Sequence, residues 1–99
     1  MSVDILEIPA IGALDLITVY WHNYEPGKGM VTFVCWGRAW NAYFGGMGGE
    51  SIQKFFSTCG ADYLLNKLVN GKQTKRDDAY LVRIIHAIQA AQRSTNDDL

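Results

Sequence analysis

The side chains of this chain that are most able to do chemistry are two cysteines and two histidines: Cys35, Cys59, His22 and His86. A thiol and an imidazole can act together as nucleophile and base, because imidazole titrates near neutral pH. Cys59 and His86 could form such a pair, but the sequence provides no recognisable group to orient the imidazole. We therefore expect that the chain is not an enzyme, and a Cys or His enzyme is the least supported hypothesis.

Cys35 and Cys59 stand in apolar segments, without a second pair of zinc ligands and without the Cys-x-x-Cys spacing of redox proteins. We expect two buried free thiols, no metal and no cofactor. The loop Gly-Gly-Met-Gly-Gly at 45–49 precedes an expected helix and could hold an anion on its backbone N–H groups. It lacks the full pattern of a phosphate-binding loop or a dinucleotide fingerprint, so a connection that allows close packing is the favoured interpretation.

Aromatic residues are concentrated between residues 16 and 50, a segment that contains all three tryptophans. Trp, Tyr, Met and Arg are the residue types enriched at energetically important positions of protein interfaces. The candidate protein-binding residues are Tyr20, Trp36, Arg38, Trp40, Tyr43 and Met47. Because one small core cannot cover all these side chains, we expect some to remain accessible. The leading hypothesis is an interface with another protein, or with a second copy in a homodimer.

Nucleic-acid binding is the alternative hypothesis, since exposed sheet aromatics can stack bases and a basic helix face can contact phosphates. The basic stripe expected on the last helix contains Arg76, Arg83 and Arg93, which could also contact an acidic partner. Residues 1–50 carry only Lys28 and Arg38 against five acidic residues, a net charge of −3. A groove that follows a nucleic-acid backbone needs several cations, so this composition disfavours the alternative.

A sheet must position these residues. Residues 16–24 and 30–36 alternate with the period of a strand, and Glu-Pro-Gly-Lys-Gly at 25–29 is typical of the turn of a hairpin. Residues 38–44 form an expected third strand after Gly37. The helix-facing residues are expected to be Ile17, Val19, Trp21, Val31, Phe33 and Cys35. Trp36 is expected on the other, semi-exposed face.

Helices are expected to follow the sheet. Ser51 can cap a helix that Gly60 ends, and a second short helix is expected over 61–69. Residues 72–76 are expected to form a loop, and Asp77 or Asp78 to cap a helix that continues to about Arg93.

The predicted fold class is α+β, a three-stranded antiparallel meander over 16–44 followed by two or three helices within 51–93, packed on one face. Residues 1–15 are expected to form an irregular arm, with at most a short edge strand at 4–8, because Pro9 and Gly12 interrupt any regular element. Residues 94–99 are expected to be a polar tail. The 99 residues are expected to form a single domain, 1–99.

The composition is 48% hydrophobic and 19% charged, which is typical of a folded globular protein. No apolar run is long enough to cross a bilayer, and no export signal is recognisable. We therefore expect no membrane partner and a location in the cytoplasm.

Three segments of the chain are distinctive: Ile-Thr-Val-Tyr-Trp-His-Asn-Tyr-Glu-Pro-Gly-Lys-Gly, then Gly-Arg-Ala-Trp-Asn-Ala-Tyr-Phe-Gly-Gly-Met-Gly, then Phe-Phe-Ser-Thr-Cys-Gly-Ala-Asp-Tyr-Leu. In these segments the chain resembles small proteins encoded by tailed phages and prophages of enterobacteria. The resemblance covers residues 16–69 and implies a non-enzymatic accessory protein in the host bacterial cytoplasm. Proteins of this kind bind and modulate or inhibit a host complex, including defence systems such as CRISPR effectors. The resemblance assigns no catalytic residue and no ligand.

Overall fold

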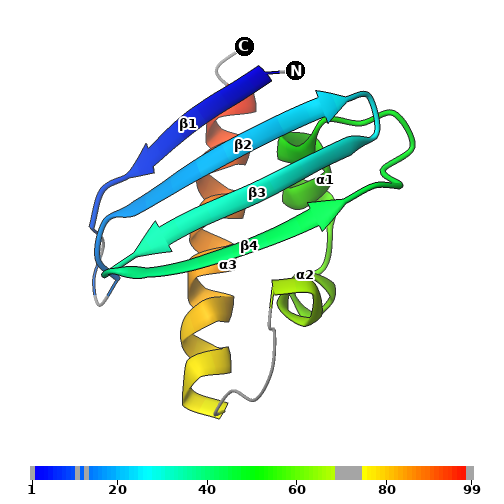
Figure 1. Cartoon of the computed structure of the whole chain (residues 1–99). Coiled ribbons are helices and arrows are strands. Elements are labelled where there is room, and N and C mark those ends of the chain that lie inside the picture. The colour runs from blue at the N-terminus through cyan, green and yellow to red at the C-terminus, as the bar shows by residue number, and fades with distance from the viewer. Residues whose placement is uncertain (1, 11, 13, 69–74, 98–99) are drawn as a thin grey trace.

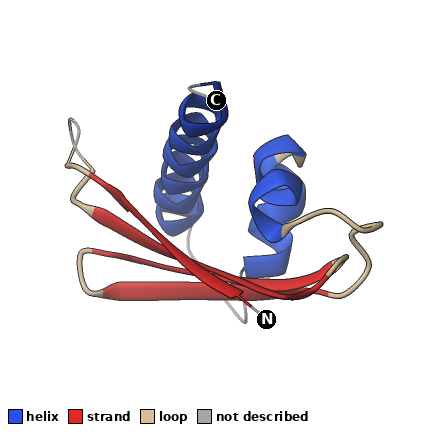
Figure 2. Cartoon of the chain, turned by 90° about the horizontal axis from the view of Figure 1, so that it is seen from above, coloured by secondary structure: helices blue, strands red, loops and turns tan. Residues whose placement is uncertain are grey.

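The computed structural model describes residues 2–10, 12, 14–68 and 75–97. Its elements are β1 (Ser2–Ile8), β2 (Ile17–Glu25), β3 (Lys28–Cys35), β4 (Arg38–Phe44), α1 (Ile52–Thr58), α2 (Ala61–Leu68) and α3 (Lys75–Asp97). The strands form one antiparallel sheet in the order β1-β2-β3-β4 (Figure 1). Figure 2 shows that the helices lie on one face of this sheet and leave the other face uncovered. The predicted α+β class is confirmed.

The number of strands was wrong: the sheet has four, because residues 2–8 of the expected irregular arm form β1. β1 pairs with β2 along its whole length, from Ser2 opposite Asn23 to Ile8 opposite Ile17. Each face of β1 mixes apolar and acidic side chains, so hydropathy does not alternate along it. Asp4 shares a face with buried Ile8, whereas Val3 and Ile5 are exposed on the opposite face. A strand whose two faces look alike gives no period-2 signal.

The helix-facing side of the sheet is the core that the alternation predicted. Ile17, Val19, Trp21, Val31, Phe33 and Cys35 are each at most 2% exposed. Phe56 of α1 packs against this layer, with ring centroids 5.5 Å from Trp21 and 6.3 Å from Phe33. The buried side of α3, which includes Leu81, Ile84, Ile85 and Ile88, completes the core.

The β3–β4 turn differs from the prediction, which placed Trp36 on a strand. Trp36 and Gly37 are the two central residues of this turn and have φ of 52° and 76°. Positive φ at both positions is the mark of a type I′ hairpin turn, which favours Asn-Gly. A bulky aromatic residue in this region is an outlier, because its Cβ crowds the following carbonyl. The chain therefore holds an exposed tryptophan at a position that disfavours it.

Replacing Trp36 with asparagine is expected to raise the free energy of unfolding by about 1 kcal/mol, because Asn adopts positive φ at lower cost. Urea unfolding followed by circular dichroism measures the change. Tyr43→Asn, at an exposed aromatic residue within β4, is the control and is not expected to stabilise the protein. A less stable Trp36→Asn variant would mean that packing of the indole outweighs the backbone strain.

The helices begin largely as expected. The Ser51 hydroxyl accepts a hydrogen bond from Lys54 N at 3.3 Å, which caps α1, and Gly60 separates α1 from α2. α3 is longer than predicted: it begins at Lys75, before Asp77, and continues to Asp97, through most of the expected tail. No Gly or Pro stands between Asp77 and Asp97 to stop the helix. The expected end of the second helix at Val69 and most of the expected 72–76 loop lie outside the described residues.

Candidate protein-binding surface

The uncovered side of the sheet is the candidate site. The strand register places its residues in three rows across β1, β2, β3 and β4. The rows are Val3, His22, Met30 and Tyr43; Ile5, Tyr20, Thr32 and Asn41; Glu7, Thr18, Val34 and Ala39. We call these twelve residues the open face.

Large side chains of the open face remain accessible. The exposed fractions are 63% for Ile5, 55% for Val3, 52% for Tyr43 and 39% for Tyr20. The rings of His22 and Tyr43 are joined through Tyr24, with centroid distances of 4.2 Å and 5.9 Å. Aliphatic and aromatic surface thus extends from β1 to β4. A contiguous apolar surface of this kind is typical of interaction sites.

Charge is scarce on the open face. Glu7 is its one carboxylate, and it contains no Lys or Arg. Next to the face, Lys28 Nζ lies 3.0 Å from Glu25 Oε1, and this contact raises the pKa of Lys28. A surface that binds a nucleic-acid backbone needs unpaired cations. The open face is therefore better suited to a protein surface than to phosphates.

The structure divides the six predicted binding residues. Tyr20 and Tyr43 lie on the open face, and Trp36 is 77% exposed at the β3–β4 turn. Trp40 and Met47 are only 7% and 5% exposed, so their assignment as surface anchors was wrong. β4 turns Trp40 toward the helices, where it stacks on Phe33 with centroids 5.6 Å apart.

Arg38 belongs to the helix side of the molecule. Its guanidinium carbon lies 4.9 Å from the centroid of the Trp40 ring, and Nη1 lies 3.3 Å from Asp77 Oδ1. The charge of Arg38 is thus compensated within the chain. Arg38 connects β4 to α3 rather than extending the open face.

The predicted basic stripe is only partly described. Arg83 and Arg93 are exposed on α3, as is His86. Arg76 lies in α3, but its side chain is outside the described residues. Neither Arg83 nor Arg93 belongs to the open face.

Sequence reasoning missed Val3 and Ile5 as surface residues because it left residues 1–15 irregular. Pairing 2–8 with the following strand would have placed both on the semi-exposed face together with Tyr20 and His22. The information that Val3 and Ile5 face outward therefore came from the alternation of β2, with which they pair, and not from residues 1–15 themselves.

The cysteines are free, and Cys59 is not activated. Burial raises the pKa of the Cys59 thiol, and the negative charge of Glu50 raises it further. A reactive cysteine requires the opposite shift, because the thiolate is the nucleophile. Among the described residues, Cys59 Sγ and His86 are not joined by a hydrogen bond, and no group of three or more His, Cys, Asp and Glu could hold a metal. The proposed Cys59–His86 pair is thus not assembled.

Cys35 instead contacts Tyr80. Cys35 Sγ lies 3.3 Å from Tyr80 Oη, and this hydrogen bond, together with burial, raises the pKa of Tyr80 to about 12 from its usual 10.0. The protonated phenol is therefore favoured in the folded state. The stability that it contributes is complete below pH 10 and is lost as the pH rises toward 12.

Replacing Tyr80 with phenylalanine is expected to lower the free energy of unfolding by about 0.5–1.5 kcal/mol near neutral pH, because the Cys35 contact is lost. The difference from wild type should shrink as the pH rises from 10 toward 12, since only the wild type has a phenol at position 80 to ionise. Urea midpoints of both proteins at several pH values measure this. A difference that stays constant with pH would contradict it.

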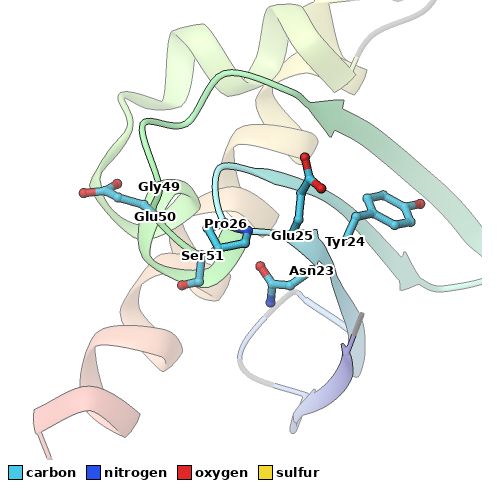
Figure 3. Close-up of a pocket in the computed structure, with 7 residues that line it drawn as sticks. All are labelled: Asn23, Tyr24, Glu25, Pro26, Gly49, Glu50 and Ser51. Atoms are coloured by element: carbon cyan, nitrogen blue, oxygen red, sulfur yellow. The ribbon is translucent and has the colours of Figure 1, made fainter.

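A pocket of about 440 Å³ lies at the β2–β3 turn. It is lined by Asn23, Tyr24, Glu25, Pro26, Gly49, Glu50 and Ser51. Figure 3 shows that the Glu50 carboxylate and the Tyr24 ring point away from each other, and that Glu25 points away from Ser51. The side chains diverge, so this pocket does not assemble a catalytic constellation.

The glycine loop 45–49 packs against the β2–β3 turn. Met47 N donates to Gly27 O at 3.0 Å, and Gly27 N donates to Glu50 O at 3.3 Å. A Cβ on Gly27 would lie 3.0 Å from Gly49 N, so a side chain there would force the hairpin turn and the loop slightly apart. The packing interpretation of this loop is supported.

The chain belongs to a phage protein family. The model of the phage family Phage_phiTE_072 matches residues 1–98. No curated protein and no solved structure matches the chain. None of the helices among the described residues is long and apolar enough to span a membrane.

Proposed function

We propose that this phage protein is a non-enzymatic accessory protein that binds a host protein through the open face of its sheet. The observation that carries the proposal is the uncovered surface of Val3, Ile5, Tyr20 and Tyr43, which the helices leave free. Burying these side chains against a partner supplies a hydrophobic driving force, and tyrosine is enriched at the energetic centre of interfaces.

The chemistry of the open face supports a protein occupant over nucleic acid. It has aliphatic and tyrosine side chains, one carboxylate and no Lys or Arg. The resemblance to proteins of enterobacterial tailed phages directs the search to an enterobacterial host. A host defence complex, such as a CRISPR effector, is the first target that we propose to test.

Ile5→Asp is expected to abolish binding of the host partner, because it places a charge on an apolar side chain of the middle row that is 63% exposed. Lys54→Glu, an exposed change on α1, is the matched control and should bind as the wild type does. Tagged proteins are compared by capture from nuclease-treated host lysate. The captured protein is then purified and its affinity for each variant is measured by calorimetry.

Hydrogen exchange of the purified complex locates the contact. Protection of β1 and β4 amides on binding, together with loss of affinity in Ile5→Asp alone, supports the proposal. Equal affinity of both variants would place the interface elsewhere. A stable homodimer that Ile5→Asp dissociates would assign the open face to a second copy instead. A mobility shift with single- or double-stranded nucleic acid at low salt that Arg83→Ala and Arg93→Ala weaken would favour the basic stripe.

A further inference from the structure

A second pocket, of about 390 Å³, lies where the β1–β2 connection approaches the β3–β4 turn. Both connections lie at the same end of the sheet (Figure 1). The described residues that line the pocket are Ala10, Gly12, Leu14, Asp15, Trp36 and Tyr80. Tyr80 comes from α3, so the pocket opens beside the helix layer and is separate from the open face.

The lining of this pocket combines two aromatic rings, aliphatic walls and one carboxylate. Trp36 is the most exposed large hydrophobic side chain among the described residues, at 77%. Asp15 is exposed, and its Oδ1 accepts a hydrogen bond from Leu16 N at 2.9 Å. None of the ion pairs formed by described residues includes Asp15. Its charge is thus available to a cation that enters the pocket.

The same protein already binds one guanidinium in this way. Arg38 lies over the face of Trp40 at 4.9 Å and pairs with the carboxylate of Asp77 at 3.3 Å. Trp36 and Asp15 present the same two groups, an indole and a carboxylate, at the edge of an open pocket. An indole face and a carboxylate together favour arginine, whose planar guanidinium stacks and forms hydrogen bonds at the same time.

We propose that this pocket binds an arginine side chain of a partner protein, with the guanidinium stacked on Trp36 and paired with Asp15, and the aliphatic stem against Leu14. Asp15, the one carboxylate among the described residues that line the pocket, complements the positive charge of such a side chain. The positive φ of Trp36 fits this role. Backbone strain in proteins is concentrated at ligand sites, and here the strained turn carries the indole that would contact the guanidinium.

The test uses the full-length protein labelled with ¹⁵N and the peptide acetyl-Gly-Arg-Gly-amide as probe. The three tryptophan indole N–H signals report separately, and Trp36 is the exposed one. The peptide is expected to shift the Trp36 signal saturably, with a Kd of about 1–10 mM, as is usual for one side chain. The same peptide with citrulline, which is neutral and nearly isosteric with arginine, is expected to bind at least about fivefold more weakly.

Asp15→Asn keeps the Oδ1 acceptor for Leu16 N and is expected to weaken the arginine peptide about fivefold. Glu25→Gln removes an exposed carboxylate that lines the other pocket and should leave the affinity unchanged. Equal binding of the citrulline peptide, equal loss in both variants, or no saturable shift of Trp36 would each overturn the proposal. The peptide titration contains no host protein. A failure of the arginine-pocket proposal can therefore be distinguished from a failure of the proposed open-face interface.

Discussion

Replacing Phe56 with alanine is expected to lower the free energy of unfolding by about 3–5 kcal/mol. Phe56 is fully buried, and its ring meets Trp21 and Phe33 edge-on at 5.5 Å and 6.3 Å. Through this ring the short helix α1 contacts the buried aromatic residues of β2 and β3. Alanine would leave a cavity between the layers, and a domain with a total stability of about 5–15 kcal/mol is sensitive to such a loss.

The control for this change is the neighbouring Phe55→Ala. Phe55 is only half-buried, and it packs toward the rim against Phe44 and Tyr63, with centroids 5.2 Å and 6.4 Å away. Both variants remove a phenyl ring from the same helix. Urea unfolding should show a clearly larger loss for Phe56→Ala. Similar losses would mean that the sheet relaxes into the space that Phe56 leaves.

Replacing Gln89 with glutamate is expected to cost about 2–5 kcal/mol at neutral pH. Gln89 of α3 is 4% exposed, and its Nε2 donates to Phe56 O at 3.0 Å and to Cys59 O at 2.8 Å. The last carbonyl groups of a helix have no hydrogen-bond donor within the helix. Gln89 supplies a donor to two carbonyls at the C-terminal end of α1, those of Phe56 and Cys59. A carboxylate of the same shape would remove both donors and place negative charge against the carbonyl oxygens.

The cost of Gln89→Glu should depend on pH. Burial and the facing carbonyls would raise the pKa of this carboxyl in the folded state, because only its protonated form can donate. The variant should therefore regain stability, relative to wild type, as the pH falls from 7 toward 5. Ala90→Glu adds the same charge at an exposed position of α3 and should not show this gain. Thermal unfolding across this pH range measures both, and a pH-independent loss would contradict the prediction.

The short helix α1 illustrates what tertiary contacts add. Seven residues are too few for a helix that is stable on its own in water. Asn23 Oδ1 of β2 accepts from Ile52 N at 2.8 Å, and Asn23 Nδ2 donates to Gln53 Oε1. Gln53 Nε2 donates in turn to Asp4 of β1. Hydrogen bonds from side chains of two strands thus stabilise the start of α1, and those of Gln89 stabilise its end.

The sequence alone determined the parts of this protein that depend on local patterns. Period-2 alternation identified β2 and β3 and their buried faces, Pro26-Gly27 marked the first hairpin turn, and Ser51 marked the start of α1. These signals concern residues that are neighbours in the chain, where backbone sterics and hydrogen bonding act directly.

The tertiary structure decided which aromatic residues reach the surface. Trp40 and Tyr43 lie an odd number of positions apart on β4 and so point to opposite faces, and the packing of α3 over one face buries Trp40 and leaves Tyr43 exposed. Val3 and Ile5 became part of the open face only through pairing of β1 with β2, and Trp36 left the strand because the turn falls on it. Alternation divides a strand into two faces, but which face is covered, and how completely, depends on the segments distant in the chain that pack over it.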